Sequence, residues 1–192
     1  ASESPDSQLN SQAGDSTIQS TSVRNLTQVA MAAALAFALA VIGKAIPLRL
    51  PQGGSITLES VPVLFIAFRY GFWSGCATGL LVGLLNLLLD PFIVHPVQIL
   101  LDYPLPFALL GTSARFATRP WMGVLLANTL RFLSHFLSGA IFFSSFAPEG
   151  MDVWGYSAIY NSLYIVPETF LGLLLIPTLL RRIPSRHQTS TS

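Results

Sequence analysis

The chain has 192 residues, of which 52% are hydrophobic and only 10% are charged, whereas about 25% of the residues of a soluble domain are charged. This composition excludes an ordinary soluble domain and indicates a membrane protein. The formal net charge of +1 gives no reason to expect a nucleic-acid partner. The single cysteine, Cys76, permits no intramolecular disulfide and leaves too few thiols for a zinc or iron–sulfur site, so we expect no metal and no cofactor.

Both ends of the chain are polar. Residues 1–24 are rich in Ser, Thr and Gln and contain no apolar run. Such a segment cannot bury enough apolar surface to become ordered, so we predict a disordered tail. Residues 184–192 are predicted to form a second, shorter disordered tail. The membrane domain is therefore expected to cover residues 25–183.

The middle of the chain contains six apolar segments, which are separated by loops that contain proline and glycine. A hydrocarbon core about 30 Å thick requires about 20 apolar residues of helix, and fewer where the helix is buried among its neighbours. In the fourth segment, Pro104 and Pro106 predict a kink. We thus predict an all-α membrane protein, a bundle of six transmembrane helices over about residues 26–43, 56–68, 71–89, 96–114, 121–146 and 154–182.

The basic residues are distributed unequally between the two predicted sides. An even number of spans places both termini on one side, and cytoplasmic loops carry an excess of Lys and Arg. Only Lys44 and Arg49 fall on the far side, which also carries Glu149 and Asp152. Both termini are therefore predicted to be cytoplasmic, together with Arg24, Arg69, Arg115, Arg119, Arg181, Arg182 and Arg186.

Small residues recur on the third predicted helix at a spacing of four. Gly75, Gly79 and Gly83 form a stripe on one helix face, and such stripes allow a second helix to approach closely. We interpret this stripe as a packing surface.

Ionisable residues inside the predicted spans are the candidates for function, because a charge in the bilayer needs a partner, a water-filled cavity or a ligand. A rotation of about 100° per residue places the polar residues of the fifth helix on one face. From a rise of about 1.5 Å per residue, the fourth, fifth and sixth helices bring polar and aromatic side chains into the outer half of the membrane. This convergence predicts a small-molecule pocket open to the exterior, with Asp102, Arg131, His135, Gly139, Phe143, Tyr156 and Asn161.

Other interpretations of these residues remain open. Asp102 and Arg131 could form an ion pair that serves only helix packing, and His135 could relay protons. An intramembrane enzyme could use His135 and Asp102 as acid and base, although the sequence has no recognisable nucleophile motif or metal set. Glu168 lies about 21 Å below the outer end of the last helix, which favours structural pairing over a place in the pocket.

The sequence lacks a nucleotide-binding motif of its own. A P-loop requires GxxxxGK followed by Ser or Thr, and the only lysine, Lys44, lies in AFALAVIGKA. Any energy from ATP would therefore have to come from a partner.

Five segments carry a resemblance to a known family. NLTQVAMAAALAF, SVPVLFIAFRYGF, QILLDYPLPFALLG, RFLSHFLSGAIFF and GYSAIYN, in this order and spacing, resemble the thiamine-specific S component of energy-coupling factor (ECF) vitamin transporters. The similarity covers about residues 25–183. It implies a non-enzymatic, multi-pass protein of the prokaryotic plasma membrane that binds thiamine from outside. It also implies docking on one transmembrane T component and two cytoplasmic ATPases.

The resemblance also implies functional residues. Eight residues of this chain stand at positions that bind the vitamin in the family. They are Asp102, Tyr103, Arg131, His135, Gly139, Phe143, Tyr156 and Asn161. Ala30 and Ala34 match the small-residue motif that meets the T component, although ordinary packing within the bundle would also explain them. Asp102 is expected to accept a hydrogen bond from the exocyclic amine of thiamine or to balance its thiazolium ring. Arg131 is expected to bind a ring nitrogen or to pair with Asp102.

Three positions depart from the family pattern, which has Glu, Lys and Trp where this chain has Asp102, Arg131 and Phe143. The loop PLRLPQGGS also lacks the tryptophan that the family places over its ligand. A thiamine precursor such as a hydroxymethylpyrimidine, a thiamine phosphate or another vitamin is therefore an alternative ligand.

Overall fold

The computed structural model describes residues 5–45, 50–51 and 53–183, with side chains from residue 23 onward. The predicted C-terminal tail, 184–192, lies outside the described residues. Within these ranges the chain is helical, and its elements are α1 (Pro5–Ala45), α2 (Ser60–Tyr70), α3 (Phe72–Leu89), α4 (Pro96–Asp102), α5 (Pro104–Ala108), the 3₁₀ helix η1 (Leu109–Phe116), α6 (Pro120–Phe142), the 3₁₀ helix η2 (Ser144–Phe146) and α7 (Val153–Arg182).

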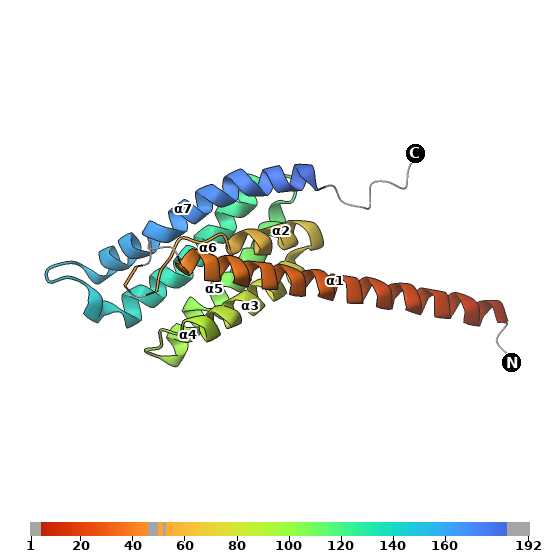
Figure 1. Ribbon diagram of the computed structural model, residues 1–192, viewed down its shortest axis with the longest axis horizontal. Helices are drawn as coiled ribbons and strands as arrows, with labels where there is room; N and C mark the ends of the chain where they lie inside the picture. The colour runs from red at the N-terminus through yellow and green to blue at the C-terminus, as the bar shows by residue number, and fades with distance from the viewer. Residues whose placement is uncertain (1–4, 46–49, 52, 184–192) are drawn as a thin grey trace.

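The first helix is longer than we expected. α1 begins at Pro5 rather than near Leu26, so helix continues through most of the segment that we predicted to be disordered. Proline is well tolerated in the first turn of a helix, and no second proline interrupts the helix before Ala45. Figure 1 shows the N-terminal half of α1 projecting away from the bundle. The boundary of the membrane domain at residue 24 stays a prediction.

The described residues form the six helical segments of the predicted bundle. Four helices have the length and hydropathy to cross a membrane, namely Val23–Ala45, Phe72–Leu89, Pro120–Phe142 and Val153–Arg182. The shorter α2 forms the second span. It begins at Ser60 and not near Ile56, with Glu59 as its N-cap residue. α4, α5 and η1 together form the fourth span. The six-helix bundle is therefore confirmed.

Two spans deviate from regular helix for local reasons. α4 stops at Asp102 and α5 begins at Pro104, with Tyr103 alone between them, because proline provides no N–H donor to continue the helical hydrogen bonds. At the predicted kink, the fourth span thus has a one-residue break between two helices. α6 ends at Phe142, so Phe143 is a C-cap residue rather than part of the helix that we extended to Phe146.

The glycine stripe of α3 packs against the interrupted fourth span, as predicted. A Cβ atom at Gly79 would collide with the carbonyl of Phe107, and one at Gly83 with the carbonyl of Tyr103. Side chains at these positions would push the fourth span outward. Close contact between α3 and α5 therefore sets where Asp102 and Tyr103 lie.

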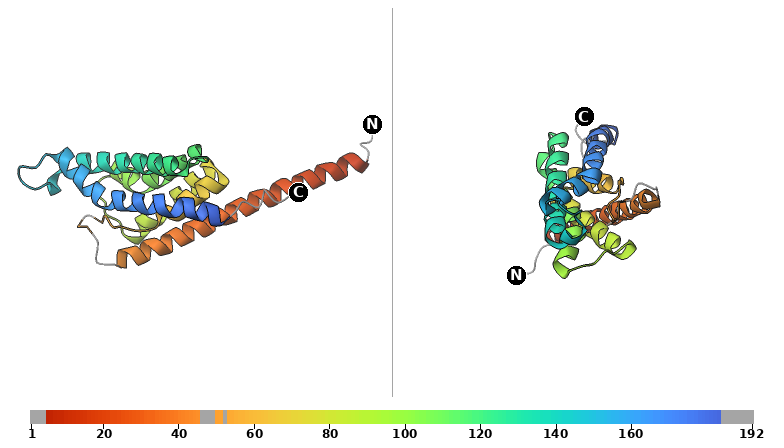
Figure 2. Two further views of the ribbon diagram at one scale, coloured as in Figure 1. Left: turned by 90° about the horizontal axis from the view of Figure 1, so that it is seen from above. Right: turned by 90° about the vertical axis from the view of Figure 1, so that its left-hand side faces the viewer.

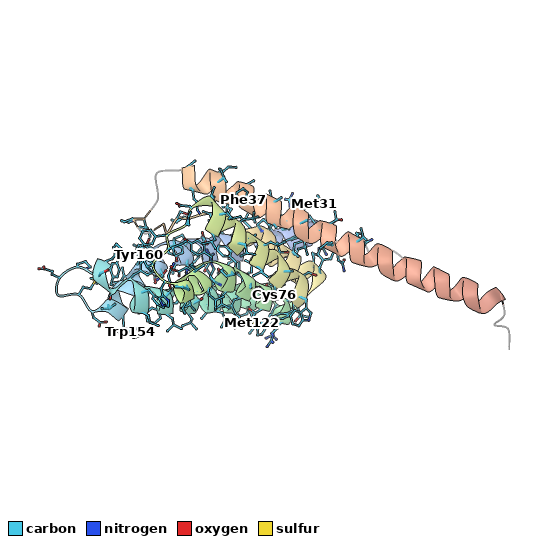
Figure 3. All side chains as sticks on the ribbon, turned by 90° about the horizontal axis from the view of Figure 1, so that it is seen from below. Met31, Phe37, Cys76, Met122, Trp154 and Tyr160 are labelled. Carbon is cyan, nitrogen blue, oxygen red and sulfur yellow. The ribbon has the colours of Figure 1, made fainter. Side chains whose placement is uncertain are left out.

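The two ends of the bundle differ. Figure 2 shows the ends of α2 and α7 and the start of α6 at the end from which α1 projects. Arg69, Arg119 and Arg181 line one groove there, in agreement with their predicted placement on one side. Trp154 and Tyr160 lie toward the opposite end, as Figure 3 shows. That end is the outer one in the predicted orientation.

Candidate functional site

A cavity opens at the outer end of the bundle between the fourth span, α6 and α7. All eight residues predicted to bind a ligand line it, together with residues of α3 and of the loop before α2. The predicted convergence of three helices is therefore present in the structure. The role of each residue in ligand binding stays a prediction. The eight are Asp102, Tyr103, Arg131, His135, Gly139, Phe143, Tyr156 and Asn161.

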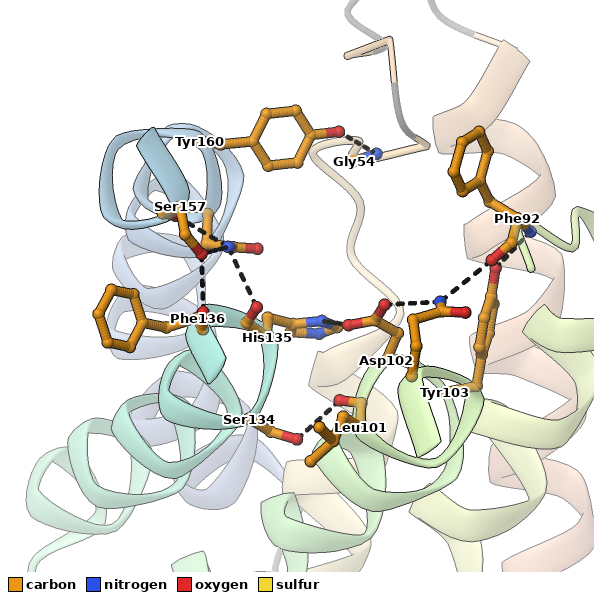
Figure 4. Close-up of polar contacts among 12 residues, drawn as sticks. Gly54, Phe92, Leu101, Asp102, Tyr103, Ser134, His135, Phe136, Ser157 and Tyr160 are labelled. Carbon is orange, nitrogen blue, oxygen red and sulfur yellow. Dashed lines mark hydrogen bonds and ion pairs between the residues drawn. The ribbon is translucent and has the colours of Figure 1, made fainter. Parts of the chain in front are cut away.

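Asp102 lies at the centre of a short hydrogen-bond chain (Figure 4). Its Oδ1 lies 3.2 Å from His135 Nδ1, and its Oδ2 accepts a 2.7 Å hydrogen bond from Gln98 Nε2. Gln98 precedes Asp102 by four residues, the spacing that brings side chains together on one helix face. Ser134 Oγ donates to the Leu101 carbonyl at 2.7 Å, which fixes α6 against α4. Both carboxylate oxygens of Asp102 are thus engaged.

His135 has one ring nitrogen left for a ligand. Because the Asp102 carboxylate accepts, we infer that Nδ1 carries the proton and that Nε2 is a hydrogen-bond acceptor. Nε2 is buried and has no hydrogen-bond partner among the described residues. The edge of the ring packs against Tyr164, with 5.9 Å between ring centroids. This arrangement is suited to accepting an N–H bond from a molecule in the cavity.

Arg131 pairs with Glu168, so the alternative that Arg131 pairs with Asp102 is wrong. Arg131 Nη1 lies 2.5 Å from Glu168 Oε2, and the two side chains are only 3% and 0% exposed. Arg131 is one turn below His135 on α6, at the depth where α7 presents Glu168. The guanidinium also lies 4.8 Å from the centroid of the Phe107 ring, within the range of a cation–π contact.

Glu168 also binds the loop that precedes α2. Its Oε1 accepts hydrogen bonds from the backbone N–H of Thr57 at 2.8 Å and from the Thr57 hydroxyl at 3.1 Å. Glu168 itself does not line the cavity. Glu168 is therefore paired and lies outside the cavity, as predicted. This pairing joins α6, α7 and the loop below the cavity.

Asn161 connects α7 to α6. Its Nδ2 donates to the His135 carbonyl at 3.3 Å and to the Ser157 carbonyl at 2.9 Å, and its Oδ1 accepts from the Tyr164 hydroxyl at 2.7 Å. A ligand that accepts from Nδ2 would have to replace one of these bonds, whereas Oδ1 keeps a second lone pair for a ligand donor.

Gly139 allows the same two helices to approach each other. A Cβ atom there would collide with the Ser157 hydroxyl, which donates at 2.7 Å to the Phe136 carbonyl. In the structure, Ser157 takes up that space, although Gly139 also lines the cavity.

Aromatic rings form the outer part of the site. Phe143 is buried and stacks on Phe92, with 5.6 Å between centroids. The hydroxyl of Tyr103 accepts a 2.7 Å bond from the Phe92 N–H and donates to the Asp90 carbonyl at 3.3 Å. Tyr103 thus presents its ring to the cavity while its hydroxyl holds the loop after α3.

Several lining residues were missed by the sequence analysis. Tyr160 and Tyr164 follow Tyr156 at a spacing of four on α7, a signal that could have placed them on the same face. Tyr160 accepts a 3.1 Å bond from the Gly54 N–H (Figure 4).

A second polar cluster also lines the cavity. Asn86 Nδ2 donates to Glu59 at 2.6 Å, and Lys44 Nζ donates to Asn86 Oδ1 at 3.3 Å. Asn86 is the one amide in the apolar run GLLVGLLNLLL, a signal that could have indicated a hydrogen bond to a neighbouring helix.

Fold and site together define a multi-pass helical membrane protein with a polar, aromatic-lined cavity at its outer end. A family model described as "Thiamine transporter protein (Thia_YuaJ)" matches residues 26–188. The chain therefore belongs to the thiamine transporter family, as its resemblance implied. This is a family of cell-membrane transporters and not of enzymes, so the alternative of an intramembrane enzyme finds no support.

Individual relatives agree with this assignment. "Thiamine transporter ThiT" of Bacillus subtilis (strain 168) is 36% identical over 183 residues, covering 86% of this chain and 95% of the relative. The protein of the same name from Lacticaseibacillus paracasei is 28% identical over 144 residues, covering 65% and 72%. A solved structure of ThiT from Listeria monocytogenes matches with a TM-score of 0.76 and 26% identity, covering 85% of this chain and 97% of that one.

Proposed function

We propose that this chain captures thiamine in the outer cavity and acts as the substrate-binding subunit of an ECF transporter. The observation that carries the proposal is the His135 ring, held by Asp102 on one side and left with an unpartnered nitrogen, within the described residues, on the other. Thiamine offers a permanent cation, an aminopyrimidine and a hydroxyethyl arm. The cavity has side chains that suit the cation and side chains that suit the aminopyrimidine.

The charges around the cavity suit a cationic ligand. The positive charge of Arg131 is balanced by Glu168, so it does not repel a thiazolium ring. Asp102 contributes a carboxylate, and Phe143 and Tyr103 contribute aromatic faces. A desolvated cation–π contact contributes about 2 kcal/mol. Arg131 acts here by holding α7 in place and not by touching the cation.

The aminopyrimidine suits the other side of the site. Its exocyclic amine is a donor, and His135 Nε2 is an acceptor in the tautomer that Asp102 selects. Asp102 then works through His135, which it orients, and through its negative field. Half-buried Tyr156 lines the same part of the cavity and completes the edge that the pyrimidine faces.

Uptake requires partners, which we propose to be one T component and two cytoplasmic ATPases. Ala30 and Ala34 are exposed on α1, one turn apart on the face that carries Met31 and Leu35. Two small side chains on an exposed helix face permit close approach of another helix. We expect Ala30→Leu with Ala34→Leu to lower ATP-driven thiamine uptake by the assembled transporter severalfold. Thiamine affinity should stay unchanged, and an equal loss of binding would contradict the assignment.

Calorimetric titration of the purified chain with thiamine tests ligand binding. Asp102→Ala should weaken binding by at least about 1.5 kcal/mol, the contribution of a charged hydrogen bond. Glu149→Ala removes an exposed carboxylate from the same outer end and should leave affinity unchanged. Hydroxymethylpyrimidine and thiamine phosphate are titrated in parallel, because tighter binding of either would replace thiamine as the ligand. Absence of heat with all three at micromolar protein would contradict the proposal.

A further inference from the structure

A second concave surface lies at the opposite end of the bundle, and we call it the cytoplasmic groove. It is formed by the end of α2, the connection from η1 to α6 and the end of α7. Its lining residues are Phe68, Arg69, Ala117, Thr118, Arg119, Pro120, Trp121, Pro177, Leu180 and Arg181. Figures 1 and 2 show these three segments together at the end where α1 projects. In the predicted orientation, this end faces the cytoplasmic leaflet.

The charge lining the groove is entirely positive. Arg69, Arg119 and Arg181 contribute three guanidinium groups, and the lining contains no acidic residue within the described part of the chain. Among the described residues, none of the three arginines forms an ion pair. Arg119 and Arg181 are exposed, and Arg69 lies over the Phe65 ring at 5.6 Å. Guanidinium groups bind phosphate oxygens through two parallel hydrogen bonds, so an anionic phosphate ester complements this set.

The apolar part of the groove identifies the source of that phosphate. Phe68 packs so closely on α6 that a Cβ atom at Gly123 would lie 2.7 Å from its ring. Trp121 is 53% exposed at the first turn of α6, and tryptophan is enriched where helices leave the membrane. Leu180 and Pro177 complete an apolar wall. Cationic and apolar groups at the membrane boundary match the two parts of a phospholipid.

We propose that the cytoplasmic groove binds the headgroup of an anionic phospholipid of the inner leaflet. The phosphate contacts the three arginines, and the glycerol and first acyl carbons contact Trp121 and Leu180. A general excess of positive charge on the cytoplasmic side needs no such convergence of arginines from α2, the η1–α6 connection and α7. The bound lipid would hold these three segments together at the membrane surface.

Two triple variants with equal net charge test the proposal. The groove variant is R69Q/R119Q/R181Q. The control variant, R24Q/R115Q/R182Q, removes three exposed arginines from the same end outside the groove. Purified full-length protein in a neutral maltoside detergent is titrated with dioleoyl-phosphatidylglycerol or dioleoyl-phosphatidylcholine. Bound lipid is counted by native mass spectrometry. Each lost arginine should weaken phosphatidylglycerol binding roughly fivefold, on the order of a hundredfold for three.

The expected result is that wild type and control retain phosphatidylglycerol over phosphatidylcholine and that the groove variant loses this preference. Thiamine binding serves as the folding check, because the cavity lies at the other end. Should the groove variant not fold, R119Q and R181Q are compared singly with R115Q and R182Q. Equal losses in groove and control variants would overturn the proposal, as would equal retention of both lipids by wild type. Competition by glycerol 3-phosphate as strong as by the lipid would also overturn it.

Discussion

Two polar centres lie one helical turn apart on α6, and they differ in how many of their hydrogen-bonding atoms have a partner in the protein. At the deeper centre, Arg131 and Glu168 are 3% and 0% exposed, and both oxygens of Glu168 are engaged. At the outer centre, His135 and Asp102 are 10% and 18% exposed, and His135 Nε2 has no partner within the described residues. We call the Arg131–Glu168 pair closed, because its hydrogen bonds lie within the protein and stabilise the bundle. We call the His135–Asp102 pair open, because its remaining ring nitrogen is available to a ligand.

The largest expected effect comes from breaking the closed pair. Glu168→Gln leaves the buried charge of Arg131 uncompensated, and loss of one partner of a buried ion pair typically costs about 3–5 kcal/mol. The free energy of unfolding, followed by thermal or chemical denaturation in detergent, should fall by that amount.

Two controls isolate the cause of that loss. Glu149→Gln changes an exposed carboxylate and should have almost no effect on stability. The double substitution Arg131→Met with Glu168→Met should recover most of the lost stability, because apolar residues of similar volume often replace a buried ion pair without penalty. A double variant as unstable as Glu168→Gln would contradict the uncompensated charge as the cause of the loss.

A smaller effect, on binding rather than on folding, is expected at the open centre. His135→Ala removes one acceptor from the cavity and should weaken thiamine binding by about 1 kcal/mol, close to the net contribution of a neutral hydrogen bond. Calorimetry measures the affinity, and thermal unfolding with and without thiamine measures stability. An equal fall in unfolding temperature in both conditions, with unchanged affinity, would make His135 a packing residue like Arg131.

Much of the site was predictable because α6 is regular. A helix with one polar face places Arg131, His135 and Gly139 at known depths, and opposing apolar faces limit where α4 and α7 can lie. The partner of Arg131 was not predictable in this way. Asp102 and Glu168 are carboxylates in two different spans. Which of them pairs with Arg131 depends on how far each helix is rotated about its axis and shifted along it.

The irregular parts were harder to predict. Phe143 and Glu59 are cap residues at the ends of α6 and α2, and helix ends depend on tertiary contacts as well as on local sequence. Asn86 lies in an apolar helix whose sequence does not identify its polar partner. Its place is explained only by Glu59, 27 residues earlier, and by Lys44.

The sequence by itself determined how many times the chain crosses the membrane, which end is basic and which helix face is polar. These are local properties, since apolar length, arginine count and helical period each belong to one segment. Only the tertiary structure decided that Arg131 pairs with Glu168, that Asp102 orients His135, and that Gly139 makes room for Ser157. Each of these contacts depends on the relative rotation and depth of two helices. Close packing around small residues sets that rotation and depth.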